Sequence, residues 1–168
     1  MSSWNYPLMT SIQPLATAIA AGNAAILKPS EVSHHTSQVL ETLVHKYLDN
    51  NYYRVIQGGV DVAVAITKAN FDLIVFTGSS DKGKLVAKAA ADNLTPCILE
   101  LGGKSPAIID ESADLDWAAN RVLFSKFMNA GQTCIATDYV LVHKKVEEKF
   151  KKLLLKQFKT AYGNNAQD

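Results

Sequence analysis

The sequence has little cysteine, no excess of either charge and no long apolar run. Its two cysteines, Cys97 and Cys134, lie far apart without the spacing of metal ligands or a disulfide framework, which indicates a reduced, cytoplasmic compartment. The 17 Lys and Arg against 16 Asp and Glu give a net charge of +1, which does not favour nucleic acid or an anionic membrane as partner. No apolar run reaches the ~20 residues needed to span a bilayer. We therefore expect no metal site and no membrane segment in this chain.

The composition that remains is that of a globular protein. The 168 residues are 48% hydrophobic and 20% charged, enough to bury a sizeable core. Apolar spacing and turn residues predict strands and helices that alternate almost throughout. The expected strands are residues 24–27, 53–56, 73–77, 97–101, 106–109 and 139–142, and the expected helices are about 8–19, 33–50, 61–70, 81–93, 115–128 and 146–162. Pro14 should kink or restart the first helix. The alternation predicts an α/β fold with a mainly parallel sheet.

One cysteine occupies a short glycine-containing turn, residues 129–136, between an expected helix and an expected strand. An exposed turn allows a thiolate to be both activated and reached, so Cys134 is a candidate nucleophile. A small packed side chain would suit the same turn equally well.

Three further stretches carry candidate chemistry, each beside a plainer alternative. Gly78 and Ser79 join a strand to a helix, where backbone N–H groups can approach a phosphate, but the usual glycine fingerprint is absent and a tight turn is the alternative. Glu100 lies in an apolar strand, where burial would disfavour its charged form and suit a general base; a surface pair with Lys104 is the alternative. Asn5 offers an amide donor beside a helix start, or belongs to an ordinary turn.

Two other features favour plain explanations. The last expected helix is rich in lysine, which is typical of a solvated face rather than of a nucleic-acid or membrane surface. The pair His34-His35 has no third ligand at useful spacing, so it does not predict a metal site.

Taken together, five ordered motifs resemble those of the aldehyde dehydrogenase superfamily. They are WNYP (4–7), AAGNAAILKPSE (20–31), FTGSSDKG (76–83), LELGGKSP (99–106) and NAGQTCIA (129–136). The stretches YRVIQGGV (53–60) and GQTCIATDYVLV (131–142) look most like the class-three branch, which handles medium- and long-chain or aromatic aldehydes. Thr137 departs from that branch, which has proline there.

The resemblance implies a role for each matching position. Cys134 would attack the aldehyde to form a thiohemiacetal and then a thioester. Asn5 and the Cys134 N–H would hold the oxyanion, and Glu100 would activate the hydrolytic water. NAD or NADP would accept the hydride. The residues implied in binding this cofactor are Lys28 and Glu31 at the adenosine ribose and Gly78 and Ser79 at the pyrophosphate.

The resemblance also implies a middle segment of a longer, homo-oligomeric enzyme. Residues 1–102 would be a Rossmann-like nucleotide-binding domain lacking its N-terminal part, with Met1-Ser2-Ser3 in place of the first strand. Residues 103–168 would begin an α/β catalytic domain that lacks its C-terminal part. Such a chain could alternatively be a non-catalytic nucleotide-binding remnant, or a partner of a full-length relative. A cofactor-free acyl-transfer protein using Cys134 would need His143, beyond a strand, as its base.

Overall fold

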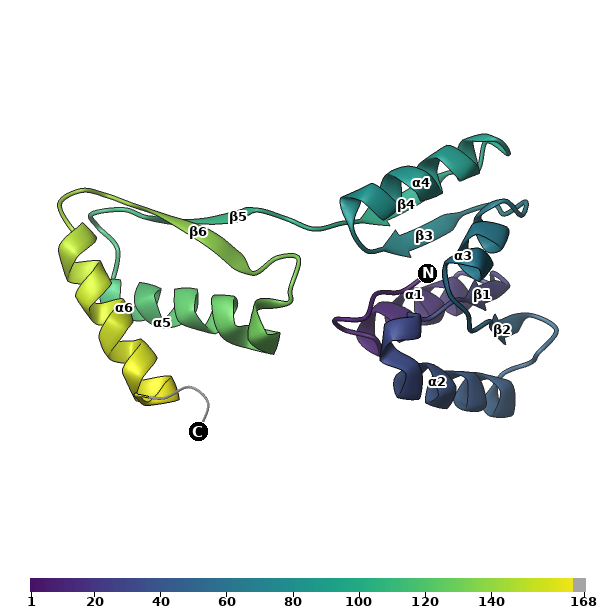
Figure 1. Ribbon diagram of the computed structural model, residues 1–168, viewed down its shortest axis with the longest axis horizontal. Helices are drawn as coiled ribbons and strands as arrows, with labels where there is room; N and C mark the ends of the chain where they lie inside the picture. Colours follow the sequence, from purple (N-terminus) through teal and green to yellow (C-terminus); the bar gives the residue numbers. More distant parts are fainter. Residues whose placement is uncertain (165–168) are drawn as a thin grey trace. The chain divides into compact units, whose positions relative to one another are not determined.

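The computed structural model describes residues 1–164, which divide into two compact units. The first unit is Met1–Leu101 and the second begins at Gly102. Both consist of parallel strands flanked by helices (Figure 1). The α/β fold predicted from the sequence is therefore confirmed, and each unit is described separately below.

The first unit contains four short strands and four α-helices. In chain order these are α1 (Met9–Ala20), β1 (Ala25–Leu27), α2 (His34–Tyr47), β2 (Tyr53–Val55), α3 (Val60–Thr67), β3 (Ile74–Thr77), α4 (Ser80–Ala91) and β4 (Cys97–Glu100), with a 3-10 turn at Glu31–Ser33. β1 pairs in parallel with β2, and β3 pairs in parallel with β4. Two apolar clusters hold the helices on these pairs, one around Leu15, Leu27, Val44 and Val55 and the other around Ile74, Val86 and Ala90.

The backbone of the first residues connects the two strand pairs. Met1 donates its amine to the Val75 carbonyl at 2.8 Å and accepts the Thr77 N–H at 3.1 Å, which is a parallel pattern. On the other side, the Ser2 N–H donates to the Lys28 carbonyl at 3.1 Å. The spatial order is thus β2, β1, the N-terminal segment (residues 1–3), β3, β4. These three residues do occupy the place of the strand that the resemblance assigns there.

Helix α1 contains a proline. Pro14 does not restart the helix, because a single helix runs from Met9 to Ala20 with Pro14 inside. The missing N–H removes only the bond to the Thr10 carbonyl in the helix's early turns. Burial of Leu15, the next residue, keeps the helix packed on the sheet.

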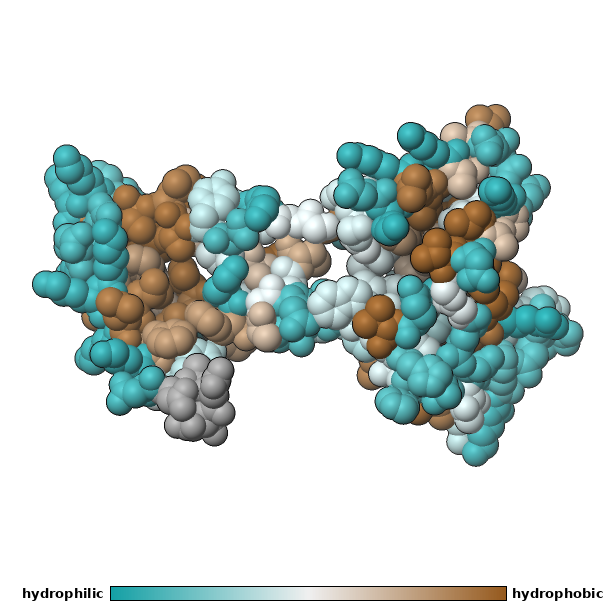
Figure 2. Space-filling model, viewed as in Figure 1, coloured by the Kyte–Doolittle hydropathy of each residue, from teal (hydrophilic) through white to brown (hydrophobic). Residues whose placement is uncertain are grey.

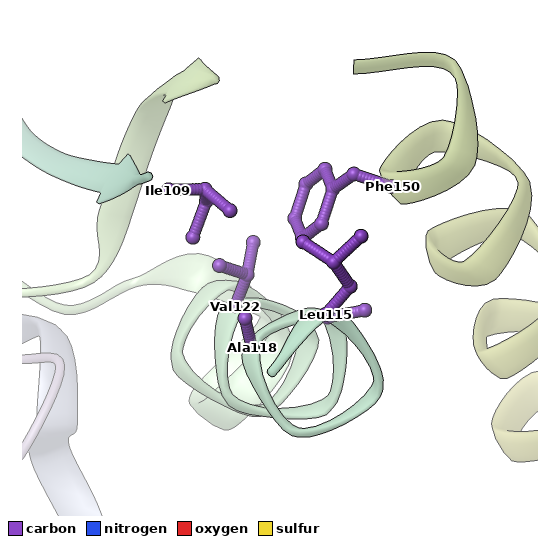
Figure 3. Close-up of a cluster of buried hydrophobic side chains, with 6 residues drawn as sticks. Ile109, Leu115, Ala118, Val122 and Phe150 are labelled. Carbon is purple, nitrogen blue, oxygen red and sulfur yellow. The ribbon is translucent and has the colours of Figure 1, made fainter. Parts of the chain in front are cut away.

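The second unit is a strand pair covered by two helices. Strands β5 (Ser105–Ile109) and β6 (Thr137–Val142) run parallel, with α5 (Leu115–Phe127), a 3-10 turn (Met128–Gly131) and α6 (Glu147–Tyr162). Figure 3 shows Ile109 of β5, Val122 of α5 and Phe150 of α6 converging in the core. Asp114 caps α5, because its carboxylate accepts the Trp117 N–H at 3.1 Å.

Every expected strand and helix is present, and bounds differ by at most three residues. The end of α2 is among the largest differences: the helix stops at Tyr47 because Asp49 accepts the Asn51 N–H at 2.9 Å and starts a turn. The lysines of the last helix are solvent-exposed, as predicted. Apolar side chains (brown) gather on the visible face of the second unit (Figure 2). In the described part of the chain, no helix is both long and apolar enough to cross a membrane.

Candidate active site

All the expected site residues of the first unit lie at one edge of its strands. Because the strands pair in parallel, their carboxyl ends share that edge. Asn5 follows the N-terminal segment, Lys28 follows β1, Gly78 and Ser79 follow β3, and Glu100 ends β4. The strands β1 and β2 lie on one side of the N-terminal segment, and β3 and β4 lie on its other side. The order in which successive strands are added to the sheet therefore reverses between the N-terminal segment and β3. Ligands of open parallel sheets bind at such a switch point.

Lys28 is a buried cation with a defined partner. It is only 5% exposed, and its ammonium donates to Glu31 Oε2 at 2.9 Å and to the Pro29 carbonyl at 3.1 Å. The Glu31 backbone N–H and the Lys28 ammonium lower the pKa of the Glu31 carboxyl. Burial without that partner would strongly disfavour the charge of Lys28. The pair therefore fixes two hydrogen-bonding groups at the end of β1.

A hollow of about 320 Å³ opens beside this ion pair. Sequence reasoning missed part of its lining, which includes Gln57, Gly58 and Gly59 after β2 together with His34. The signal was available, since a Gly-Gly step after a strand indicates close approach of the backbone. Gly58 has a φ of 149°, a conformation that other residues rarely adopt.

Gly78 and Ser79 form a tight strand-to-helix turn. The Gly78 N–H donates to the Glu100 carbonyl at 3.0 Å, so it belongs to the sheet and cannot also serve a phosphate. A Cβ on Gly78 would lie 2.5 Å from the Phe76 ring, which explains the need for glycine. Ser79 caps α4 by accepting the Lys82 N–H at 3.4 Å, and its side chain is exposed. The turn therefore lets a ligand come close to the backbone and offers the Ser79 hydroxyl as a hydrogen-bonding group.

Asn5 is held by a buried serine that sequence reasoning missed. The Ser3 hydroxyl donates to Asn5 Oδ1 at 2.7 Å, which assigns the oxygen of this amide to the interior contact. The NH₂ group of Asn5 is therefore the part of the amide that does not accept the Ser3 bond.

Glu100 differs from the sequence expectation. The residue is exposed at the end of β4, so the burial expected from its apolar neighbours is wrong. The strand alternates half-buried and exposed positions, and Glu100 falls on the exposed face. Lys104, considered as its partner, forms an ion pair with Asp138 at 3.2 Å instead.

In the second unit, Cys134 is exposed on a turn with an unusual backbone. Asn129, Ala130 and Gly131 are consecutively left-handed, with φ of 53°, 55° and 77°. For a residue such as Ala130 this conformation costs on the order of 1–2 kcal/mol. The structure thus presents the thiol to solvent rather than packing it.

The glycine turn after β4 touches the Cys134 backbone. A Cβ on Gly103 would lie 2.5 Å from the Cys134 carbonyl oxygen, so only glycine fits there without a shift. The strand register places Ser105 opposite Thr137, which aligns the start of β5 with the start of β6. Residues 102–106 of the LELGGKSP motif and the NAGQTCIA motif therefore meet within the second unit. His143, in contrast, follows β6 at its far end, about 20 Å of strand away, which excludes a Cys134–His143 pair.

The remaining candidates lie outside these clusters. Cys97 is half-buried in β4 and packs on the core around Ile74. The rings of His34 and His35 are 5.4 Å apart and tilted. Within residues 1–164, no group of three or more His, Cys, Asp or Glu is placed to hold a metal ion.

A comparison with models of protein families identifies the family of this chain. The model described as "Aldehyde dehydrogenase family" matches residues 1–168. The chain belongs to the aldehyde dehydrogenase family. It is 49% identical over 166 residues to the dimeric NADP-preferring aldehyde dehydrogenase of Rattus norvegicus, a match that covers 99% of this chain and 37% of that protein. It is 46% identical over 165 residues to aldehyde dehydrogenase family 3 member A2 of Mus musculus, covering 98% and 34%.

Solved aldehyde dehydrogenase structures agree with the fold. The substrate-bound state of Staphylococcus aureus AldH matches with a TM-score of 0.93 and 45% identity, covering 98% of this chain and 36% of that one. The predicted family and its class-three branch are therefore confirmed. The chain spans little more than a third of the length of these aldehyde dehydrogenases.

Proposed function

We propose that this chain supplies the nucleophile, the hydrolytic base and the nucleotide site of an NAD- or NADP-dependent enzyme that oxidises aldehydes to carboxylic acids. The observation that carries the proposal is the exposed Cys134 turn, against whose backbone Gly103 packs. Exposure and a constrained backbone suit a nucleophile better than a packing residue. The name of the NADP-preferring rat relative supports the cofactor.

The first steps assign separate tasks to Cys134 and Asn5. The Cys134 thiolate attacks the aldehyde carbon, and the carbonyl electron pair moves to oxygen. The Asn5 NH₂ group and the Cys134 N–H stabilise that oxyanion. The Ser3–Asn5 bond supports this task because it occupies the amide oxygen and leaves the NH₂ group as the donor of this side chain.

The hollow beside the Lys28–Glu31 pair fits the ribose of a nucleotide. Glu31 lines the hollow and supplies an acceptor for hydroxyls, the buried Lys28 ammonium holds this carboxylate from beside the hollow, and Gly58 and Gly59 leave space in its lining. Ser79 donates toward the pyrophosphate from the start of α4, where the helix dipole favours negative charge. A bound nicotinamide supplies the hydride acceptor, which leaves the acyl group on Cys134 as a thioester.

Glu100 completes the reaction by removing a proton from water. The water oxygen attacks the thioester carbon, the carbon–sulfur bond breaks, and Cys134 is released with the carboxylic acid. The exposed position of Glu100 gives it access to water. Its place at the end of β4, directly before the Gly102-Gly103 turn, links it in sequence to the segment that packs on the Cys134 backbone.

A second candidate function is nucleotide binding without turnover. It is favoured because the Lys28–Glu31 pair and its hollow lie wholly within the first unit. Residues of the longer relatives that have no counterpart in these 168 residues would then be needed for catalysis, and for oligomer formation.

Two measurements on the 168-residue chain test these functions. The first is cofactor-dependent oxidation of a medium-chain or aromatic aldehyde, compared with Cys134→Ala and with Cys97→Ala as the matched cysteine control. Turnover lost only in Cys134→Ala supports catalysis by this chain. The second is NAD and NADP affinity by calorimetry. Binding without turnover supports the nucleotide-binding function, and neither binding nor turnover contradicts both functions for the isolated chain.

A further inference from the structure

The backbone of the Cys134 turn has to be held by its surroundings. Three consecutive left-handed residues, Asn129, Ala130 and Gly131, precede it. Non-glycine residues keep such conformations only where neighbouring contacts impose them. Gly103 braces one side of the turn, and a second contact is required where the turn enters β6.

One serine provides that contact. Ser125 lies in α5, before the turn, and Thr137 opens β6, after it. The Thr137 N–H and the Thr137 hydroxyl both donate to Ser125 Oγ, each at 3.0 Å. Both residues are half-buried, so water competes weakly for these bonds. A single oxygen atom therefore joins the two ends of the segment that carries Cys134.

The backbone N–H of Thr137 makes this pairing obligatory. A half-buried N–H that lacks a partner costs free energy, and in this position the acceptor comes from the helix rather than from a neighbouring strand. A proline at this position could not form the bond, because it has no backbone N–H. Ser125 and Thr137 thus work as a unit in this chain.

We propose that Ser125 is a positioning residue for Cys134. It fixes the first residue of β6 on α5 and so keeps the turn in the conformation that exposes the thiol. Without it, the turn relaxes toward commoner backbone conformations, and the 74%-exposed Ile135 folds back and covers the sulfur. This inference rests on the proposed nucleophilic role of Cys134.

The test measures thiol presentation without turnover. Iodoacetamide alkylation of the 168-residue chain is followed between pH 6 and 10, with the Cys134 and Cys97 peptides quantified separately by mass spectrometry. Ser125→Ala, which removes both bonds, is expected to lower the high-pH plateau rate of Cys134 about thirtyfold, the factor equivalent to two hydrogen bonds of about 1 kcal/mol each. Ser125→Thr, which keeps the hydroxyl, should restore most of that rate. Ser112→Ala, which removes another hydroxyl of the second unit, should change nothing.

An unchanged or faster Cys134 rate in Ser125→Ala, with Cys97 unaffected, would overturn the proposal. Faster alkylation of half-buried Cys97 would instead report unfolding. In that case the milder variant Thr137→Val tests the proposal, because it keeps the backbone N–H bond to Ser125 Oγ and removes only the hydroxyl bond. It should slow alkylation of Cys134 about fivefold, the factor for one hydrogen bond of about 1 kcal/mol, and a wild-type rate would refute the role of Ser125. If the chain oxidises no aldehyde, the proposed function is overturned, but the alkylation rates of Cys134 and Cys97 still test the role of Ser125.

Discussion

Gly103 leaves no room for a side chain beside Cys134. A Cβ at Gly103 would lie 2.5 Å from the Cys134 carbonyl oxygen, a distance that backbone atoms cannot accept. The neighbouring Gly102 has open space, with nothing within 4 Å of an added Cβ. Two adjacent glycines of one motif therefore have different requirements.

Replacing Gly103 by alanine should destabilise the second unit. The clash forces the Cys134 backbone or the start of β5 to move, at a cost of about 1–3 kcal/mol. Urea unfolding monitored by circular dichroism measures the change, and Gly102→Ala is the matched control with an expected change within about 0.5 kcal/mol. Equal stabilities for the two variants would contradict the close contact.

Replacing Lys28 by methionine should weaken binding of NAD or NADP at least tenfold. Methionine keeps the apolar stem but removes the charged donor, and a hydrogen bond to a charged group is worth about 1.5–3 kcal/mol. Calorimetric titration measures the affinity. Lys88→Met, at an exposed position in the last turn of α4, is the control and should bind as wild type. Wild-type affinity in Lys28→Met would place the nucleotide elsewhere.

The amine of Met1 should make stability depend on pH. Burial of the amine, which is the larger effect, and the nearby charge of Lys28 lower the pKa of the amine from 8.0 to about 6. Between pH 6 and pH 8 the unfolded chain therefore binds a proton that the folded chain does not, so the free energy of unfolding rises with pH. The rise is on the order of 2 kcal/mol and levels off above pH 8. Urea unfolding at pH 6, 7 and 8 measures it.

Acetylating the same amine provides the control for that measurement. The acetylated chain cannot gain the charge at Met1 but keeps every other ionisable side chain. Its unfolding free energy should change less with pH than that of the free amine. Identical pH profiles would show that the amine does not contribute.

Exposed apolar side chains should make the isolated chain self-associate. On the second unit, Ile108 is 74% and Trp117 is 62% exposed, beside a hollow of about 500 Å³. Apolar patches of a few hundred Å² promote association in water. Sedimentation velocity should show a sedimentation coefficient that rises with concentration, less steeply for Ile108→Lys than for the exposed control Lys152→Ala. A monomer with a cooperative thermal transition would contradict this prediction.

Periodicity predicted the fold well because each element carries its own signal. The parallel pairing of β3 with β4, for example, follows from apolar strands separated by the helix around Val86. A new helix start at Pro14, one of the two outcomes expected there, is absent, and the burial of Leu15 beside Pro14 is a contact that the local pattern does not show. Tertiary contacts decide such cases, and a local pattern does not contain them.

The candidate site was less predictable because it depends on which side chains face which partners. The burial expected for Glu100 failed because an apolar strand with one covered face still has an exposed face. The Ser3–Asn5 and Ser125–Thr137 bonds join residues whose types carry no distinctive pattern. The assignments of Asn5, Cys134 and the cofactor-binding residues stay predictions until the variants are measured.

The N-terminal segment has a consequence for the way the first unit comes apart. The β1–β2 pair and the β3–β4 pair have separate apolar clusters and are joined through the backbone of Met1 and Ser2. We therefore expect each half to open while the other stays intact, as two foldons joined through residues 1–3. Hydrogen exchange should then show two protection levels, one in each half.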